Sequence, residues 1–240
     1  MKNQIRFATV LCAICAGFML VGCANFTPPP ESAADDDGPS RCEALAMIDD
    51  VQDGDDQILI QQGRGGFIYS FADEFGSKIK PDVDGSFVPV RGGVDGGFSY
   101  RFKGKLAKAS DPYAGMGFSF LEPEGPFDAS SYKGISFIAK RGKNSIGTIR
   151  VQIPDVNTES EAGVCKECFN DFGIGLQLTE EWTRYEVSFD DLKQLGGWGD
   201  PRPMHVDVKQ LYGIKFQVSG SEAAFDIWID DVTFIGGCDK

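Results

Sequence analysis

The stretch near the C-terminus, residues 225–234, constrains the fold more than any other. Apolar side chains occupy every second position from Phe225 to Ile229, with polar or amphipathic residues between them. A period of two is typical of a half-buried β-strand. The apolar parity then switches at Val232, which a regular strand cannot do. The pattern therefore predicts a strand with a β-bulge at Asp230-Asp231.

Short apolar segments of strand length recur through the chain and are separated by glycine, proline and other turn residues. The sequence contains 30 glycines and 12 prolines, and shows no helical period beyond a possible turn at residues 190–195. Many short strands between turn signals predict an all-β fold, an antiparallel β-sandwich or barrel. Asp49-Asp50, flanked by apolar residues, echoes the acidic pair of the last strand, so we expect the first and last strands to be neighbours. Beside the first strand, which begins at Met47, the predicted strands include 66–71, 98–102, 116–120, 135–139, 149–153, 185–189, 214–218 and 225–234.

The N-terminus has the features of an export signal. Lys2 and Arg6 precede a nearly continuous apolar run, residues 8–21, which is short for a membrane span of about 20 residues. The run ends in Leu-Val-Gly-Cys at residues 20–23, which resembles a bacterial lipobox. This resemblance implies cleavage before Cys23, acylation of Cys23 and anchoring in the bacterial cell envelope, with Ala24 favouring the outer membrane. A plain secretory signal with a chance cysteine is the alternative.

The predicted domain organisation is a signal peptide at 1–22, a disordered tether at 23–41 and one folded domain at 42–240. The tether is rich in proline, aspartate and small residues and cannot bury enough apolar surface to fold. The formal net charge is −13, which disfavours nucleic acid and anionic lipid surfaces as partners.

Four cysteines remain beyond the signal and the lipobox, and four cysteines allow three connectivities. Cys42 and Cys238 bracket the domain, so we expect them to pair if the terminal strands meet, leaving Cys165 and Cys168 to close a small loop. A redox motif or a zinc site at residues 165–168 are the alternatives. The sequence offers neither the βαβ context of the first nor the second ligand pair of the second.

Two predicted strands carry long polar side chains on one face. Arg150 and Gln152 alternate with aliphatic residues in 148–153, and Lys215 and Gln217 do the same in 214–219. An ordinary solvated face of an antiparallel sheet is one interpretation. A ligand-binding face flanked by aromatic residues is the other.

Six segments together resemble family 11 carbohydrate-binding modules, which are galactose-binding-like jelly rolls. In chain order they are 48–51, 132–137, 149–152, 179–189, 211–217 and 227–234. The resemblance covers most of residues 48–234 and implies a concave sheet face on which aromatic rings stack on sugar rings. It places Arg150 on that face, while Gln152 and Gln217 are added from strand parity and Asp155 from its position after the strand. The expected ligand-binding residues are Arg150, Gln152, Asp155, Gln217, Tyr69, Trp198 and Tyr113. Trp198, in a glycine-flanked loop, could instead plug the edge of the core.

The same resemblance implies a structural calcium ion near the joined termini. Asp50 and Asp230 would supply carboxylate oxygens, and Gln52 stands where the family typically has glutamate. The amide lacks a charge, which would weaken the site. Solvated acidic turns without a metal are the alternative.

The sequence shows no signature of an enzyme. The lone histidine, His205, has no nucleophile motif near it, and no zinc-protease, hydrolase or phosphate-loop motif occurs. We therefore expect a monomeric, non-catalytic lipoprotein that binds a polysaccharide or oligosaccharide. A module for protein interaction or envelope assembly on the same fold is the alternative, and a glycoside-active enzyme is a third hypothesis.

Overall fold

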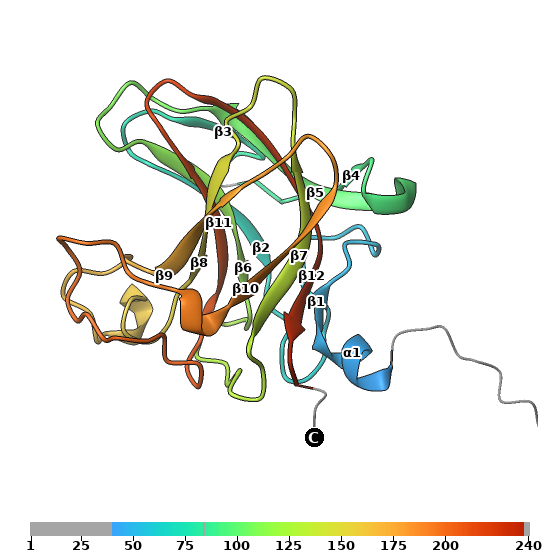
Figure 1. Cartoon of the computed structure of the whole chain (residues 1–240), viewed down its shortest axis with the longest axis vertical. Helices are drawn as coiled ribbons and strands as arrows, with labels where there is room; N and C mark the ends of the chain where they lie inside the picture. Colours follow the sequence, from blue (N-terminus) through green and yellow to red (C-terminus); the bar gives the residue numbers. More distant parts are fainter. Residues whose placement is uncertain (1–39, 84, 238–240) are drawn as a thin grey trace, which may run out of the picture. The chain divides into compact units, whose positions relative to one another are not determined.

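The structure is a computed structural model that describes residues 40–83 and 85–237. Two antiparallel β-sheets face each other and enclose one core (Figure 1). The predicted all-β sandwich is therefore confirmed. The expected signal peptide, the lipidated Cys23 and nearly all of the expected tether lie outside the described residues, as does Cys238. The described residues contain no helix long and apolar enough to cross a membrane.

The larger sheet has seven strands in the order β10-β7-β12-β5-β3, with β1 paired to β12 and β4 paired to β5. The bounds of its strands are β1 Met47–Asp49, β3 Lys78–Lys80, β4 Val90–Arg91, β5 Phe98–Lys105, β7 Gly134–Arg141, β10 Thr183–Ser188 and β12 Ala224–Ile235.

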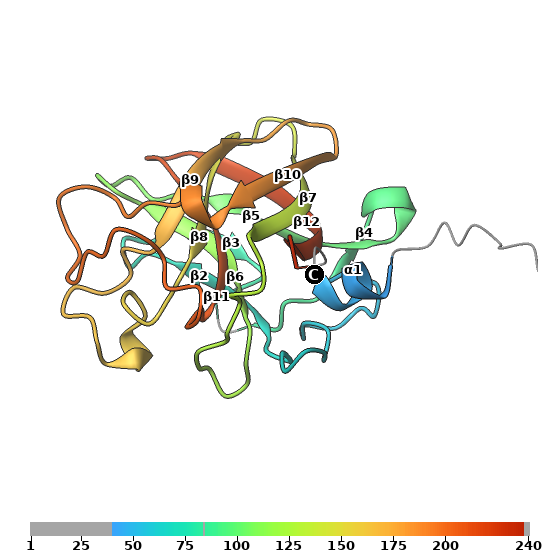
Figure 2. The same cartoon turned by 60° about the horizontal axis from the view of Figure 1, so that its bottom comes forward.

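The smaller sheet has five strands in the order β2-β6-β11-β8-β9. Its strands are β2 Ile68–Ala72, β6 Tyr113–Ser119, β8 Thr148–Ile153, β9 Phe172–Gln177 and β11 Gly213–Ser219. Figure 2 shows long loops, between β8 and β9 and between β10 and β11, gathered at the same end of this sheet. Strands β3, β4 and β9 were not predicted, because β3 and β4 are very short and β9 alternates aliphatic residues with glycine.

Strand β12 organises the larger sheet, as its sequence pattern predicts. It lies between β5 and β7 and also pairs with β1, so the first and last strands are neighbours. The register of β12 on β7 shifts between Asp230 and Thr233, and Asp231 adopts a positive φ of 46°. The predicted bulge is therefore confirmed, and it lets Ile229 and Val232 both face the core.

The core is formed by the alternate apolar residues of both sheets. Phe216 of β11 packs edge-on against Phe118 of its own sheet and against Phe137 of the opposite sheet, with ring centroids 5.9 and 4.9 Å apart. All three rings are fully buried. Edge-to-face pairs add about 0.5–1.5 kcal/mol each beyond the burial of their area. These aromatic contacts therefore tie the two layers together.

Within residues 40–83 and 85–237, helical structure is confined to short segments. Helix α1, Arg41–Ala46, was not predicted; Ser40 and Glu43 form a capping box at its N-terminus. Three 3₁₀ turns follow in chain order: η1 Val94–Gly96, η2 Ser160–Ala162 and η3 Phe189–Asp191. The turn expected at residues 190–195 overlaps η3 only in part.

Candidate functional site

A cavity of about 440 Å³ opens on the outer face of the five-stranded sheet. Strands β2, β6, β8 and β11 supply its floor, and the loops at 154–171 and 193–201 supply one wall. Five of the expected ligand-binding residues line it. The full lining is Tyr69, Phe71, Ala72, Tyr113, Glu124, Gln152, Glu159, Phe169, Asn170, Asp171, Leu195, Trp198, Lys215 and Gln217.

A row of aromatic rings crosses one side of the floor. Phe67, Tyr69 and Phe71 alternate along the chain at β2, and their neighbouring ring centroids are 5.8 and 6.3 Å apart. Tyr113 at the start of β6 continues the row, 6.3 Å from Phe71. The rings are tilted by about 50° to one another. Such a row offers successive apolar faces to a flat ligand.

Glycines of β6 make room for two of these rings. A Cβ atom at Gly117 would lie 2.3 Å from Cζ of Tyr69, and one at Gly115 would lie 2.5 Å from Cζ of Phe71. Real Cβ contacts essentially never fall below 3.0 Å, so any other residue at Gly117 would push the Tyr69 ring off the sheet. At Gly115 the added atom would collide with the Phe71 ring and also with the Phe216 carbonyl oxygen, 2.3 Å away. The alternation of glycine with buried Ala114, Met116 and Phe118 therefore makes β6 smooth on its outer face.

The two glutamines expected from parity lie together on the floor. Gln152 of β8 is opposite Lys215 of β11, and Gln217 is opposite Arg150. Gln217 donates to the hydroxyl of Ser219 at 3.2 Å. Amide groups beside aromatic rings can donate to and accept from hydroxyl groups of a ligand.

Lys215 is the centre of a charged cluster at the inner end of the cavity. Its ammonium lies 3.0 Å from Asp171 and 3.5 Å from Glu159. Burial alone would lower the pKa of Lys215, but Asp171, with further help from Tyr69 and Glu159, raises it overall, so the lysine stays charged. Burial, and then repulsion by Glu159, raises the pKa of Glu124.

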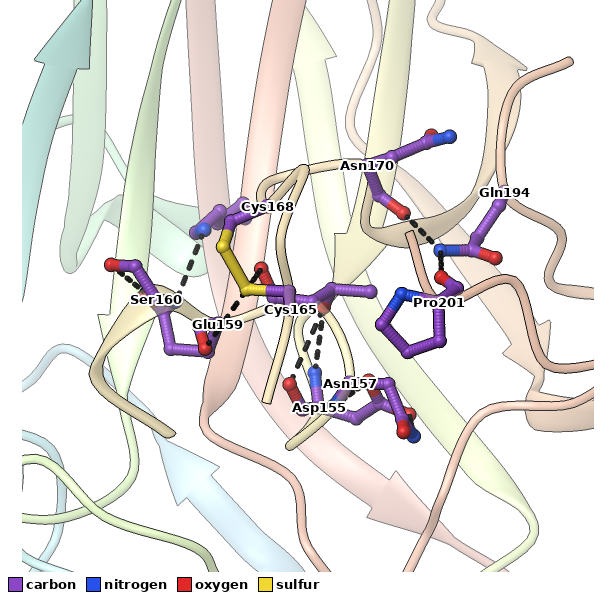
Figure 3. Close-up of a disulfide and its surroundings, with 11 residues drawn as sticks. Asp155, Asn157, Glu159, Ser160, Cys165, Cys168, Asn170, Gln194 and Pro201 are labelled. Atoms are coloured by element: carbon purple, nitrogen blue, oxygen red, sulfur yellow. Dashed lines mark hydrogen bonds and ion pairs between the residues drawn. A yellow bond between two sulfur atoms is a disulfide. The ribbon is translucent and has the colours of Figure 1, made fainter. Parts of the chain in front are cut away.

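The wall of the cavity is built by two loops that are pinned to each other. Cys165 and Cys168 form a disulfide, the interpretation favoured for this motif (Figure 3). Asn170, almost fully buried, donates to the carbonyls of Leu195 and Trp198 at 3.0 and 2.6 Å, and its side-chain oxygen accepts the Leu195 N–H at 2.9 Å. Gln194 adds bonds to the carbonyls of Asn170 and Pro201 (Figure 3).

With the two loops held by the disulfide and these hydrogen bonds, two large apolar side chains, Phe169 and Trp198, are exposed at the rim of the cavity. Phe169 directly follows the disulfide, has a positive φ of 70° and is 55% exposed. Trp198 is 42% exposed and lines the cavity, so it does not plug the core. The Lys215 ammonium lies 5.6 Å from the Phe169 ring centroid, so the ring also borders the charged cluster. A non-glycine residue at positive φ is uncommon, and such residues cluster at binding sites.

Two expected ligand-binding residues do not line the cavity. Arg150 donates to the backbone carbonyls of Asp171 and Lys193, at 3.2 and 2.6 Å, and so holds the loop after β10 against β9. Asp155 is fully buried, and it accepts the backbone N–H groups of Asn157 and Asp207. Both side chains bond to the loops that form the wall and lie outside the lining of the cavity, so their contact with a ligand stays a prediction.

Sequence reasoning missed several lining residues. Phe71 shares the parity of Tyr69, and Lys215 that of Gln217, so both could have been found from the strand pattern. Phe169, Asn170 and Leu195 lie in loops with no periodicity. No local signal places such residues at a sheet face.

The residues expected to bind calcium lie near one another but are used by the protein itself. The amide of Gln52 accepts from the Phe98 N–H and donates to the Asp50 carbonyl. Asp230 accepts the N–H groups of Val94 and Asp231. Within residues 40–83 and 85–237, no group of three or more acidic, histidine or cysteine side chains could hold a metal ion. Calcium at Asp50, Gln52 and Asp230 stays a prediction.

Burial disfavours the ionised form of two aspartates near the joined termini. It raises the pKa of Asp230 to about 6, with a smaller contribution from Asp231, and it raises the pKa of Asp49 to about 7. Asp49 accepts from the Tyr100 hydroxyl at 2.8 Å and from the Val51 N–H at 2.7 Å.

Cys42 lies in α1, and its expected pairing with Cys238 involves a residue outside the described part of the chain.

No protein-family model matches the chain, and no curated protein matches it. Solved structures do. The family 11 carbohydrate-binding module of the cellulosomal cellulase Lic26A-Cel5E of Clostridium thermocellum matches 79% of this chain and 93% of its own, at TM-score 0.53 and 19% identity.

Another structure of a family 11 module from the same organism, in complex with a β-1,3-1,4-mixed-linked tetrasaccharide, matches 78% of this chain and 98% of its own, at TM-score 0.53 and 17% identity. A solution structure of CtCBM11 matches 70% of this chain and 88% of its own, at TM-score 0.50 and 17% identity. Identities this low establish shared architecture alone. This chain therefore has the antiparallel β-sandwich fold of the family 11 carbohydrate-binding modules.

Proposed function

We propose that this protein is a lipid-anchored envelope protein whose β-sandwich domain binds a glycan, without catalysis, in the cavity of the five-stranded sheet. The observation that carries the proposal is the row of Tyr69, Phe71 and Tyr113 in the cavity, with Phe67 continuing it along the chain. Tyr69 and Phe71 lie over glycines of β6, and Gln152 and Gln217 line the same cavity. Pyranose rings have apolar CH faces and a rim of hydroxyl groups. Aromatic rings and amides match these two surfaces.

The geometry favours a chain-like ligand over a single sugar. The row extends over three successive ring pairs, each separated by about 6 Å. Trp198 and Phe169 on the opposite wall would cover a chain lying along the row. The mixed-linked tetrasaccharide bound by a matched family 11 module is a reasonable first ligand to test.

The likeness to carbohydrate-binding modules favours binding without catalysis. Glycoside hydrolysis needs a protonated carboxylic acid and a second carboxylate flanking the scissile bond. Glu124, Glu159 and Asp171 all line the cavity, so the absence of turnover has to be measured. A test for reducing-end products on any retained glycan checks this part of the proposal.

The proposed anchoring rests on the lipobox-like residues 20–23, and the acidic, proline-rich residues that follow would serve as the tether to the membrane. Incorporation of labelled palmitate in a bacterial host tests this, because wild type should be labelled and Cys23→Ser should not. Labelling of the Cys23→Ser variant, or its absence from wild type, would contradict anchoring without affecting glycan binding.

A glycan array tests the binding proposal. Residues 40–240, made in an oxidising compartment, should retain one class of glycan, and Trp198→Ala and Tyr113→Ala should each reduce the retention. Phe75→Ala is the matched control, because Phe75 is an aromatic residue that is 61% exposed but does not line the cavity. A folded domain that retains no glycan would contradict the proposal and favour a protein partner. Equal loss with Phe75→Ala would also contradict it.

A further inference from the structure

The outer face of the seven-stranded sheet carries two opposed pairs of lysines. Lys78 of β3 is directly opposite Lys105 of β5, and Lys80 is opposite Lys103. All four side chains are exposed. Alternate residues of a strand lie about 6.5–7 Å apart and neighbouring strands about 4.8 Å apart, so the four lysines occupy one compact patch. We call these four residues the lysine patch.

The lysine patch destabilises the protein when no ligand is bound, because like charges directly opposite each other in a sheet repel. Lys80 contacts Asp82. Among the residues that the structure describes, no carboxylate lies within ion-pair distance of Lys78, Lys103 or Lys105. Protection of the sheet edge explains lysines on the edge strand β3. It does not explain those on β5, which is paired on both sides.

Two further cations extend the positive surface across the same sheet face. Trp228 of β12 is opposite Arg101 on β5 and Lys140 on β7. The guanidinium of Arg101 and the ammonium of Lys140 lie 4.3 and 5.0 Å from the Trp228 ring centroid. Lys140 also lies 4.4 Å from the ring of Trp182. The indoles therefore hold these charges in place, which lowers the entropy lost when an anion binds.

This basic face contrasts with the rest of the molecule, since the whole chain carries a formal net charge of −13. Asp226 is paired with Arg101 and neutralises one charge of the face. Charges at physiological salt act over about 8 Å, so a narrow ligand on this face experiences mainly the lysines. A broad anionic surface, such as a membrane, would also meet the acidic residues around the face.

We propose that the lysine patch, extended by Arg101 and Lys140, binds a single polysaccharide chain that carries carboxylate or sulfate groups. A polymer with anions at regular intervals can contact lysines on both strands at once. The binding face lies on the sheet opposite the cavity of the proposed function and does not depend on that function. A protein with both sites would join two glycans.

The test measures binding of polygalacturonate and dextran sulfate, with neutral dextran as the uncharged comparison, to residues 40–240 at low and moderate salt. We expect both charged polymers to bind, neutral dextran not to bind, and affinity to fall as salt rises. Lys103→Gln/Lys105→Gln should weaken binding roughly 30-fold, since each lysine near an anionic surface contributes about fivefold. Both side chains are exposed, so the variant should fold normally.

The matched control is Lys193→Gln/Lys209→Gln, which removes two exposed lysines from elsewhere in the chain. It should change affinity less than twofold. An equal loss in the control would overturn the proposal, because net charge alone would then explain binding. Failure of both charged polymers to bind at low salt would also overturn it. So would tighter binding to duplex DNA or to vesicles with anionic lipid, since a broad surface would then be the better partner.

Discussion

Replacing Gly117 by alanine should displace the ring of Tyr69 in the aromatic row and so weaken glycan binding, while the fold stays intact. The added Cβ would lie 2.3 Å from Cζ of Tyr69 and 2.5 Å from its hydroxyl oxygen. Ordinary contact begins at 3.4 Å, so the Tyr69 ring must rise from the sheet by about 1 Å or turn toward solvent. Overpacking of this kind costs about 1–3 kcal/mol when the ring stays in place and less when it turns away.

The effect on binding should exceed the effect on stability. A ring displaced by about 1 Å no longer stacks on the sugar that the row positions, and an aromatic contact is worth on the order of 1 kcal/mol. We therefore expect affinity for the retained glycan, measured by titration calorimetry, to fall roughly five- to tenfold. Gly175→Ala on β9 is the matched control. A Cβ there meets nothing within 4 Å, so affinity should not change, and the melting temperature should stay the same or rise slightly.

A double-mutant cycle tests the reasoning directly. Tyr69→Ala removes the ring with which the new Cβ collides, so adding Gly117→Ala to Tyr69→Ala should cost nothing further in affinity or stability. Additive losses would show that Gly117 acts through something other than Tyr69. Unchanged affinity in Gly117→Ala alone would show that the platform is not where the glycan binds. Either result would refute the account of the cavity floor.

Three further predictions concern the termini and the rim. Burial raises the pKa of Asp49 to about 7 from an ordinary 3.8, so its stabilising contribution is complete below pH 3.8 and is lost as pH rises through 7. The loss is on the order of 4 kcal/mol, and Asp49→Asn should flatten this part of the pH dependence in urea unfolding. If calcium binds at Asp50 and Asp230, then millimolar calcium at pH 8 should raise the melting temperature, and a chelator should reverse the rise; no change would exclude the ion. Cys165→Ser/Cys168→Ser should weaken glycan binding severalfold by freeing the rim at Phe169, with a small change in melting temperature, and unchanged affinity would contradict the role given to this loop.

The fold could be predicted because its signal is local and repeated. The alternation in 148–153 and 214–219 places Ile149, Val151, Ile214 and Phe216 in the core, as the structure confirms. The parity switch near Asp230 predicted a bulge, which the structure also contains. A period of two states which side chains share a face, and that is enough to predict two packed sheets, though not the order of their strands.

The site could be predicted only where it is made of strands. Gln152 and Gln217 were found from parity, whereas Phe169 and Asn170 depend on loops whose course is set by a disulfide and by buried hydrogen bonds. Arg150 shows a different limit of the strand pattern. Its polar face was predicted, but backbone carbonyls of a distant loop take its guanidinium, and a sequence pattern does not reveal such partners.

Chemical-shift mapping of residues 40–240 with the glycan retained on the array, or with the mixed-linked tetrasaccharide if none is retained, tests the central claim most directly. The account predicts that the largest shifts fall on the amides of Tyr69, Gly115, Gly117 and Gln217, with small shifts on β5 and β12 of the opposite sheet. Shifts confined to the seven-stranded sheet, or none at millimolar concentrations of either ligand, would contradict it.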